Sequence, residues 1–171
     1  MKTTILAITM FVAFGTSFCQ AQNTFVEEEK VSTVLDAWHK AAAEANFEEY
    51  FGHMTEDAIF IGTDATENWT FAEFKKFSKP YFDKGKAWSF SAVERHIFFA
   101  DNGKIAWFDE LLDTQMKLCR GSGVLELQKG GDWKIVHYVL SLAIPNENVE
   151  QIVGLKSTKD SILTKMLKEK Q

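Results

Sequence analysis

The sequence predicts an α+β fold in which helices come first and an antiparallel β-sheet follows. Apolar residues recur at three- and four-residue spacing before residue 46, as in helices. After Gly85 come long stretches typical of strands, separated by turn signals. A third observation is the load of fifteen Phe and five Trp residues, which need concave, apolar surroundings. A chain of 171 residues suits one domain with a substantial core.

The first predicted helix covers residues 26–45. Three consecutive glutamates in its first turns complement the positive end of the helix dipole. A second, short helix at 47–54 is followed by a strand at 58–61. The apolar face of the first helix is formed by Val31, Val34, Leu35, Trp38, Ala42 and Ala45.

The segment 62–69 is a polar loop with one aromatic residue, Trp69. Thr70 and Glu73 have the spacing of a capping box, so a third helix should begin there. We expect this helix to stop or kink near Pro80 and the segment to end at Gly85.

Four strands are expected after Gly85, at residues 88–100, 105–113, 116–128 and 133–144. Asn102-Gly103 and Gly130-Gly131 are hairpin signals, because glycine readily adopts the positive φ angles of tight turns.

In the last strand, successive side chains should point to opposite faces of the sheet, so the residues divide into two sets. Both are largely apolar, so we expect one to lie under the helices and the other to meet a second copy of the chain. The polar residues of the first face predict a polar spot inside an apolar cavity. Trp133, Ile135, His137, Val139 and Ser141 form that face, and Lys134, Val136, Tyr138, Leu140 and Leu142 form the other.

Residues 1–21 have the pattern of a cleaved export signal. Lys2 precedes a short apolar run, and Cys19 and Ala21 are small residues at the −3 and −1 positions of a cleavage site. The run is shorter than the roughly 20 residues that span a bilayer. A buried helix, a membrane anchor or a lipid-modified Cys19 are the alternatives. We therefore expect a soluble exported protein, periplasmic or extracellular, with no membrane segment after cleavage.

The mature chain divides into a domain at 22–147 and a Lys-rich extension at 148–171, which we expect to be helical and to pack on the domain or on a partner copy. Its only cysteine is Cys119, so no internal disulfide is expected. Removing Lys2 changes the formal charge from −5 to −6. No basic stripe indicates nucleic-acid binding, no close histidine pair indicates a metal, and no glycine-rich motif indicates a cofactor.

Short motifs follow one another in order between residues 24 and 146. They are Trp38, Thr55-Glu56-Asp57-Ala58, Gly62-Thr63-Asp64, Ala106-Trp107-Phe108-Asp109-Glu110, Arg120-Gly121-Ser122-Gly123-Val124-Leu125 and Trp133-Lys134-Ile135-Val136-His137-Tyr138. Through them the chain resembles the SnoaL-like branch of the nuclear transport factor 2 (NTF2-like) superfamily.

This resemblance implies a cone-shaped, cystatin-like fold, with N-terminal helices packed in a curved antiparallel sheet and a pocket at the open end. It also implies pairing through the outer sheet face. Members include ketosteroid isomerase-like and cyclase-like enzymes and non-enzymatic association domains, so the fold alone implies no reaction. Aligned with the isomerase branch, the general-base Asp falls on Gly62 and the oxyanion-hole Tyr on Trp38. Neither residue can do that chemistry.

Two residues are candidates for catalysis, His137 and Asp109, because a carboxylate can orient an imidazole for acid–base work. The alternative is a histidine bonded to backbone or water and an aspartate at the rim of the sheet. Arg120 is the candidate anchor for an anion, or a partner of Asp109 or Glu110 across strands.

The predicted ligand contacts are Trp38, Asp64, Trp69, Trp107, Arg120 and His137. The acids Asp64 and Glu67 lie in the loop near the expected pocket mouth, although loop acids are more often caps and turn-formers. The first hypothesis is therefore an exported, homodimeric binding domain for a small, partly apolar ligand, anionic if Arg120 contacts it. A cofactor-independent isomerase, dehydratase or cyclase using His137 and Asp109 is the second hypothesis, and a structural dimerisation domain is the third.

Overall fold

The computed structural model describes residues 25–170, so the predicted export signal at 1–21 lies outside the described residues. An N-terminal helix spans residues 25–43. The remaining elements are α2 (Phe47–Gly52), β1 (Met54–Ile61), β2 (Asn68–Thr70), α3 (Phe71–Asp83), β3 (Phe90–Phe99), β4 (Ile105–Thr114), β5 (Lys117–Leu127), β6 (Trp133–Leu142), a short 3₁₀ helix (Asn146–Asn148) and α4 (Val149–Lys168).

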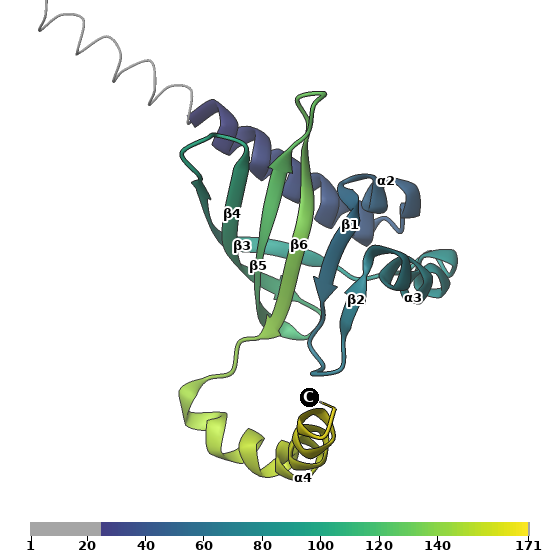
Figure 1. Cartoon of the computed structure of the whole chain (residues 1–171), viewed down its shortest axis with the longest axis vertical. Coiled ribbons are helices and arrows are strands. Elements are labelled where there is room, and N and C mark those ends of the chain that lie inside the picture. The colour runs from purple at the N-terminus through teal and green to yellow at the C-terminus, as the bar shows by residue number, and fades with distance from the viewer. Residues whose placement is uncertain (1–24, 171) are drawn as a thin grey trace, which may run out of the picture.

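The strands form one strongly curved sheet in the order β2-β1-β6-β5-β4-β3, with the N-terminal helix, α2 and α3 packed on its concave side (Figure 1). The predicted α+β fold, with N-terminal helices packed in a curved sheet, is thus confirmed. Two details differ from the prediction. The short strand β2 was expected to be loop, and β1 pairs with β6 in parallel, whereas the other four pairs of this sheet are antiparallel.

The start of α3 is set by the predicted capping box. The Thr70 hydroxyl accepts from the Glu73 amide at 3.4 Å, and Glu73 Oε2 accepts from the Thr70 amide at 2.9 Å. Pro80 does not stop the helix, which continues to Asp83. Gly85 then turns the chain with a φ of 68°. The cap fixes the direction of α3, and with it the aromatic side chains that this helix carries.

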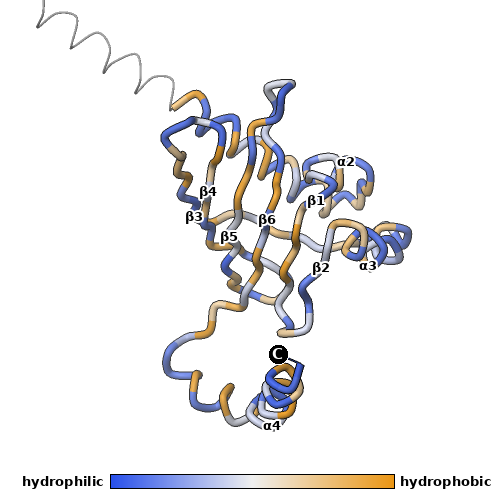
Figure 2. Tube along the Cα trace, in the orientation of Figure 1, coloured by the Kyte–Doolittle hydropathy of each residue, from blue (hydrophilic) through white to orange (hydrophobic). Residues whose placement is uncertain are grey.

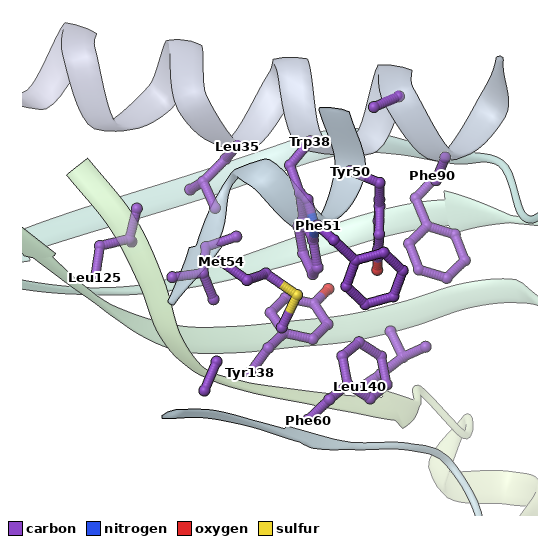
Figure 3. Packing of buried hydrophobic residues seen from close by; sticks show 14 of the residues in the cluster. Leu35, Trp38, Tyr50, Phe51, Met54, Phe60, Phe90, Leu125, Tyr138 and Leu140 are labelled. Carbon is purple, nitrogen blue, oxygen red and sulfur yellow. The ribbon is translucent and has the colours of Figure 1, made fainter. Parts of the chain in front are cut away.

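The core lies between the N-terminal helix and the concave face of the sheet, and it is largely aromatic (Figure 3). Trp38 stacks on Tyr50 with ring centroids 5.0 Å apart and meets the edge of Tyr138 at 4.7 Å. Phe60 and Phe74 stack at 3.9 Å. Contacts between several rings at once explain why so many Phe and Trp residues fit one small domain.

A β-bulge in β6 overturns the alternation predicted for that strand. Val124 pairs with His137 but Leu125 pairs with Ile135, so β6 has one extra residue, Val136. The extra residue returns Tyr138 to the concave side together with Ile135, and it turns His137 to the convex side. The predicted polar spot at His137 inside the cavity is therefore wrong.

Gly123 lies opposite this bulge, and only glycine fits there. A Cβ at Gly123 would lie 2.4 Å from the His137 carbonyl oxygen and 2.8 Å from Phe108 Cε1. We expect Gly123→Ala to lower the free energy of unfolding by about 1–3 kcal/mol, because backbone or ring must move. Gly130→Ala is the matched control, since its nearest neighbour would be 3.6 Å away. Equal urea midpoints for the two variants would contradict this account.

Helix α4 extends away from the sheet and has no buried residue (Figure 1). Apolar residues nevertheless recur along it (Figure 2), among them Leu155, Ile162 and Met166, all at least half exposed. Within residues 25–170, no helix combines the length and apolar character needed to cross a membrane.

Candidate functional site

A pocket of about 350 Å³ lies at the open end of the curved sheet. Its wall is mostly aromatic, and a cavity of this size and lining is typical of small-molecule sites. Larger hollows of about 610 and 710 Å³ lie along α4, but the first is lined by α4 and the residue after it, without any residue of the sheet domain. The lining residues of the 350 Å³ pocket are Phe60, Gly62, Thr63, Glu67, Trp69, Phe74, Phe77, Tyr81, Ala87, Trp88, Phe90, Gln115, Met116 and Leu140.

Helix α3 provides one side of this pocket. Phe74, Phe77 and Tyr81 are three, four and seven residues apart, so they lie on one face of the helix. Trp69 of β2 stacks on Phe77 at 4.5 Å and on Phe74 at 5.6 Å. This aromatic face of α3 was not predicted from the sequence, although the three- and four-residue spacing of the three rings is enough to indicate it.

The interior of the cone below the pocket is filled with side chains. Trp38, Tyr50 and Tyr138 are all at most 1% exposed, and they occupy the centre of the packing in Figure 3. Among residues 25–170, Trp38 Nε1 and the Tyr50 hydroxyl are buried without a hydrogen-bond partner. The space left for a ligand is consequently the mouth of the cone, not its depth.

One carboxylate belongs to the pocket wall, that of Glu67 in the loop between β1 and β2. Its Oε2 accepts a hydrogen bond from the Asp64 amide at 3.1 Å. Gln115 is the other long polar side chain on the wall, and its Oε1 accepts from the Ser89 amide at 3.3 Å.

A second polar group lies deeper, around Glu110 of β4, whose side chain is 0% exposed. Glu110 Oε1 accepts from His39 Nε2 at 2.8 Å and from the Tyr138 hydroxyl at 3.3 Å. Arg95 Nε donates to Oε2 at 3.0 Å, and its Nη2 lies 2.9 Å from the same oxygen without hydrogen-bond alignment. Because an ionised carboxylate only accepts, His39 must carry the hydrogen on Nε2.

This buried cluster joins the N-terminal helix to β3, β4 and β6. Arg95 Nη1 also donates to Ser32 Oγ at 2.9 Å and lies 2.8 Å from Asp36 Oδ1, both on the N-terminal helix. The Phe90 ring, on the pocket wall, lies 5.8 Å from the His39 ring, so the cluster is behind the wall and not part of it. Its role is structural. The cluster was not predicted from the sequence, although Glu110 is two residues from both Phe108 and Leu112 and so lies on the same, apolar face of β4.

Burial raises the pKa of the Glu110 carboxyl, but the His39 hydrogen bond and the charges of His39 and Arg95 outweigh it. The pKa of Glu110 therefore lies below its usual 4.5. A lowered carboxyl pKa stabilises the fold above the unfolded-state pKa, and that stability is lost as the pH falls through the folded-state pKa.

We expect the stability advantage of the wild type over Glu110→Gln to shrink as the pH falls below about 4.5. Urea unfolding of both proteins between about pH 7 and about pH 3 measures it. Parallel curves across that range would show that the pKa of Glu110 is the same in the folded and unfolded states, which would contradict a lowered pKa in the folded protein.

The structure separates the predicted catalytic pair. His137 of β6 and Asp109 of β4 both lie on the convex face with β5 between them, and Asp109 is in register with Val139, not with His137. At the usual strand spacing and rise, the Cα atoms of His137 and Asp109 are about 12 Å apart. Asp109 instead lies 3.2 Å from His96 Nδ1, and Arg120 Nη1 is 3.6 Å away. None of these side chains is on the pocket wall. Their expected place inside the cone is therefore wrong, because alternation along β4 and β5 directs Asp109 and Arg120 outward, and the bulge in β6 turns His137 outward.

The other four predicted ligand contacts lie in four different places. Trp69 is on the pocket wall. Trp38 is core, and Trp107 is on the convex face, stacked on Phe98 at 5.9 Å. Asp64 is a turn-former whose Oδ1 accepts from the Thr66 amide at 2.9 Å, and it lines the 710 Å³ hollow beside α4. Within residues 25–170, no three His, Cys, Asp or Glu side chains gather to hold a metal ion.

The sequence profile of the SnoaL-like domain matches residues 31–145, which is most of the chain. The chain belongs to the SnoaL-like domain family. No functionally curated protein matches the sequence.

Solved structures share the fold of this SnoaL-like domain. A candidate scytalone dehydratase from Novosphingobium aromaticivorans superposes with a TM-score of 0.62 at 12% identity, over 72% of this chain and 89% of the other. A candidate dehydratase of the NTF2-like family from Streptomyces avermitilis gives 0.61 at 13% identity, over 71% and 99%. A candidate ketosteroid isomerase from Shewanella frigidimarina gives 0.53 at 18% identity, over 64% and 92%. At these identities the likeness shows the fold alone.

Proposed function

We propose that this SnoaL-like domain binds a small, flat, largely apolar molecule in the pocket at the open end of the cone. The observation that carries the proposal is the aromatic wall built by Trp69, Phe77 and their neighbours on α3. Aromatic rings bind flat apolar ligands by stacking and by removing apolar surface from water. A volume of about 350 Å³ suits one or two fused rings rather than a long chain.

The expectation of an anionic ligand rested on Arg120 as an anchor. Arg120 is on the convex face near Asp109, and the carboxylate on the pocket wall belongs to Glu67. Like charges repel at such short range, so a neutral or cationic ligand fits the wall better than an anion.

Proton-transfer catalysis is the alternative. Its support is that two of the structural relatives are named as a candidate dehydratase and a candidate isomerase. However, His137 and Asp109 are on separate strands of the convex face and do not meet. Binding is therefore the function we place first.

Calorimetric titration of the wild type and of Trp69→Ala with 1-naphthylmethanol, a neutral probe, tests the proposal. We expect about a tenfold loss of affinity, since one stacking surface of the pocket is removed. Trp107→Ala is the matched control because it removes an exposed tryptophan from the convex face. If wild type does not bind the probe, or if both variants bind as wild type does, the pocket proposal fails.

We propose in addition that two copies pair through the convex face of the sheet. This face carries the Phe98–Trp107 stack, with both rings close to half exposed, beside the charged group of His96, Asp109 and Arg120. Apolar surface rimmed by charges is typical of protein interfaces. Light scattering should give a dimer that Trp107→Glu converts to a monomer, and a monomeric wild type would refute the pairing.

We further propose that residues 1–21 direct export and are removed, leaving a periplasmic or extracellular domain. The support is the pattern of Lys2, the apolar run and the small residues before Gln22. Mass spectrometry of the natively produced protein should find Gln22 at the amino terminus, whereas an intact or lipid-linked Cys19 peptide would contradict it.

A further inference from the structure

Glu67 is the single charged residue on the wall of the aromatic pocket. The rest of that wall is apolar, aromatic or neutral. A carboxylate beside stacked rings is unusual, because burying part of a charge costs free energy unless a partner compensates it. Within residues 25–170, Glu67 forms no ion pair, although it also lines the 710 Å³ hollow that Lys156 and Lys159 border.

The loop between β1 and β2 turns back so that Glu67 lies against Gly62. The Gly62 amide donates to the Glu67 carbonyl at 2.9 Å, and the Glu67 amide donates to the Asp64 carbonyl at 2.9 Å. A Cβ built on Gly62 would lie 2.2 Å from Glu67 Oε2. The carboxylate thus occupies the space that any side chain at position 62 would fill, and glycine is what admits it to the pocket.

The two oxygens of Glu67 are not equivalent. Oε2 accepts the Asp64 amide at 3.1 Å, which fixes the carboxylate in place. Oε1 has no hydrogen-bond partner in the described part of the chain. A fixed carboxylate with one unused oxygen, on a wall that is otherwise mostly aromatic, can accept a charge-assisted hydrogen bond from a cationic ligand. The π faces of Trp69 and the neighbouring rings also attract a cationic group of a ligand.

We propose that Glu67 makes this pocket selective for protonated amines carried on a flat aromatic body. The ring system stacks on Trp69 and Phe77, and the ammonium group donates to Glu67 Oε1. This selectivity rests on the proposed binding function and specifies its ligand class. For ligands with the same ring, it predicts that affinity is highest for the ammonium compound, lower for the neutral alcohol and lowest for the carboxylate.

The test uses three probes with the same ring: 1-naphthylmethylamine, 1-naphthylmethanol and 1-naphthoate. Calorimetric titration near neutral pH should show the amine binding about tenfold more tightly than the alcohol. Glu67→Gln should remove most of that preference while changing alcohol binding less than about twofold, because Gln keeps the shape and loses the charge.

Two further variants separate this role from a general effect of loop charge. Asp64→Asn removes a carboxylate three residues away that does not line the pocket, and it should keep the amine preference. Gly62→Ala places a methyl group against Glu67 Oε2 and should weaken amine binding as Glu67→Gln does. Urea unfolding of each variant checks that the fold is retained.

The outcomes distinguish the two proposals. Equal binding of amine and alcohol to wild type, or an amine preference that survives Glu67→Gln, overturns the role of Glu67 and leaves the pocket standing. No binding of any probe overturns the pocket and the selectivity together.

Discussion

Glu110→Ala is expected to lower the free energy of unfolding by about 3–5 kcal/mol, the largest loss we expect for any single polar side chain here. The variant removes the carboxylate partner of His39, which is 5% exposed, and leaves Arg95, which is 9% exposed, with only the exposed Asp36 as a counter-charge. It also removes the acceptor for the Tyr138 hydroxyl. Since the free energy of unfolding of a small domain is about 5–15 kcal/mol in total, this variant would lose much of its stability. The melting temperature should fall by roughly 10 °C.

Asp36→Ala is the matched control for this prediction. It removes the other carboxylate of Arg95, 2.8 Å from Nη1, but Asp36 is 67% exposed. Exposed ion pairs contribute about 0–1 kcal/mol, so this variant should unfold nearly as wild type does. The double variant Arg95→Met with Glu110→Met should recover part of the loss, because no unpaired charge remains at Arg95. Equal losses for Asp36→Ala and Glu110→Ala would contradict the assignment of Glu110 as the buried centre.

Trp38→Ala is expected to cost about 3–5 kcal/mol, a loss of the same size with a different cause. Trp38 is 1% exposed and contacts Tyr50 and Tyr138 through its rings, so truncation leaves a cavity at the centre of the core. Trp38→Phe should cost only about 1 kcal/mol. It keeps an aromatic ring and removes the indole N–H, which is buried without a partner in the described structure.

Phe25→Ala is the control for Trp38, because Phe25 lies on the N-terminal helix and is 68% exposed. This variant should lower the free energy of unfolding by less than about 1 kcal/mol. Chemical denaturation of the three variants measures the differences. If Trp38→Ala were as stable as wild type but had lost affinity for the naphthyl probe, Trp38 would be a ligand contact, as predicted from the sequence, and not a core residue.

The predictable part of the fold is the part controlled by neighbours in sequence. The capping box of Thr70 and Glu73 forms as expected, because its two hydrogen bonds join residues three apart. The N-terminal helix also follows from residues three and four apart, which share one face in any helix. Trp69 lines the pocket because β2, which precedes α3 directly, lies at the mouth of the cone.

The sequence alone thus determined the helices, most of the strands, the family resemblance and one residue of the pocket. Only the tertiary structure decided which face each strand residue takes, because the Val136 bulge depends on how β6 pairs with β5 across Gly123. It alone brought His39 of the N-terminal helix to the Arg95–Glu110 pair of the β3–β4 hairpin. It also placed Glu67 in the space left by Gly62. Such contacts arise from the curvature and register of the sheet, and no local pattern of residues encodes them.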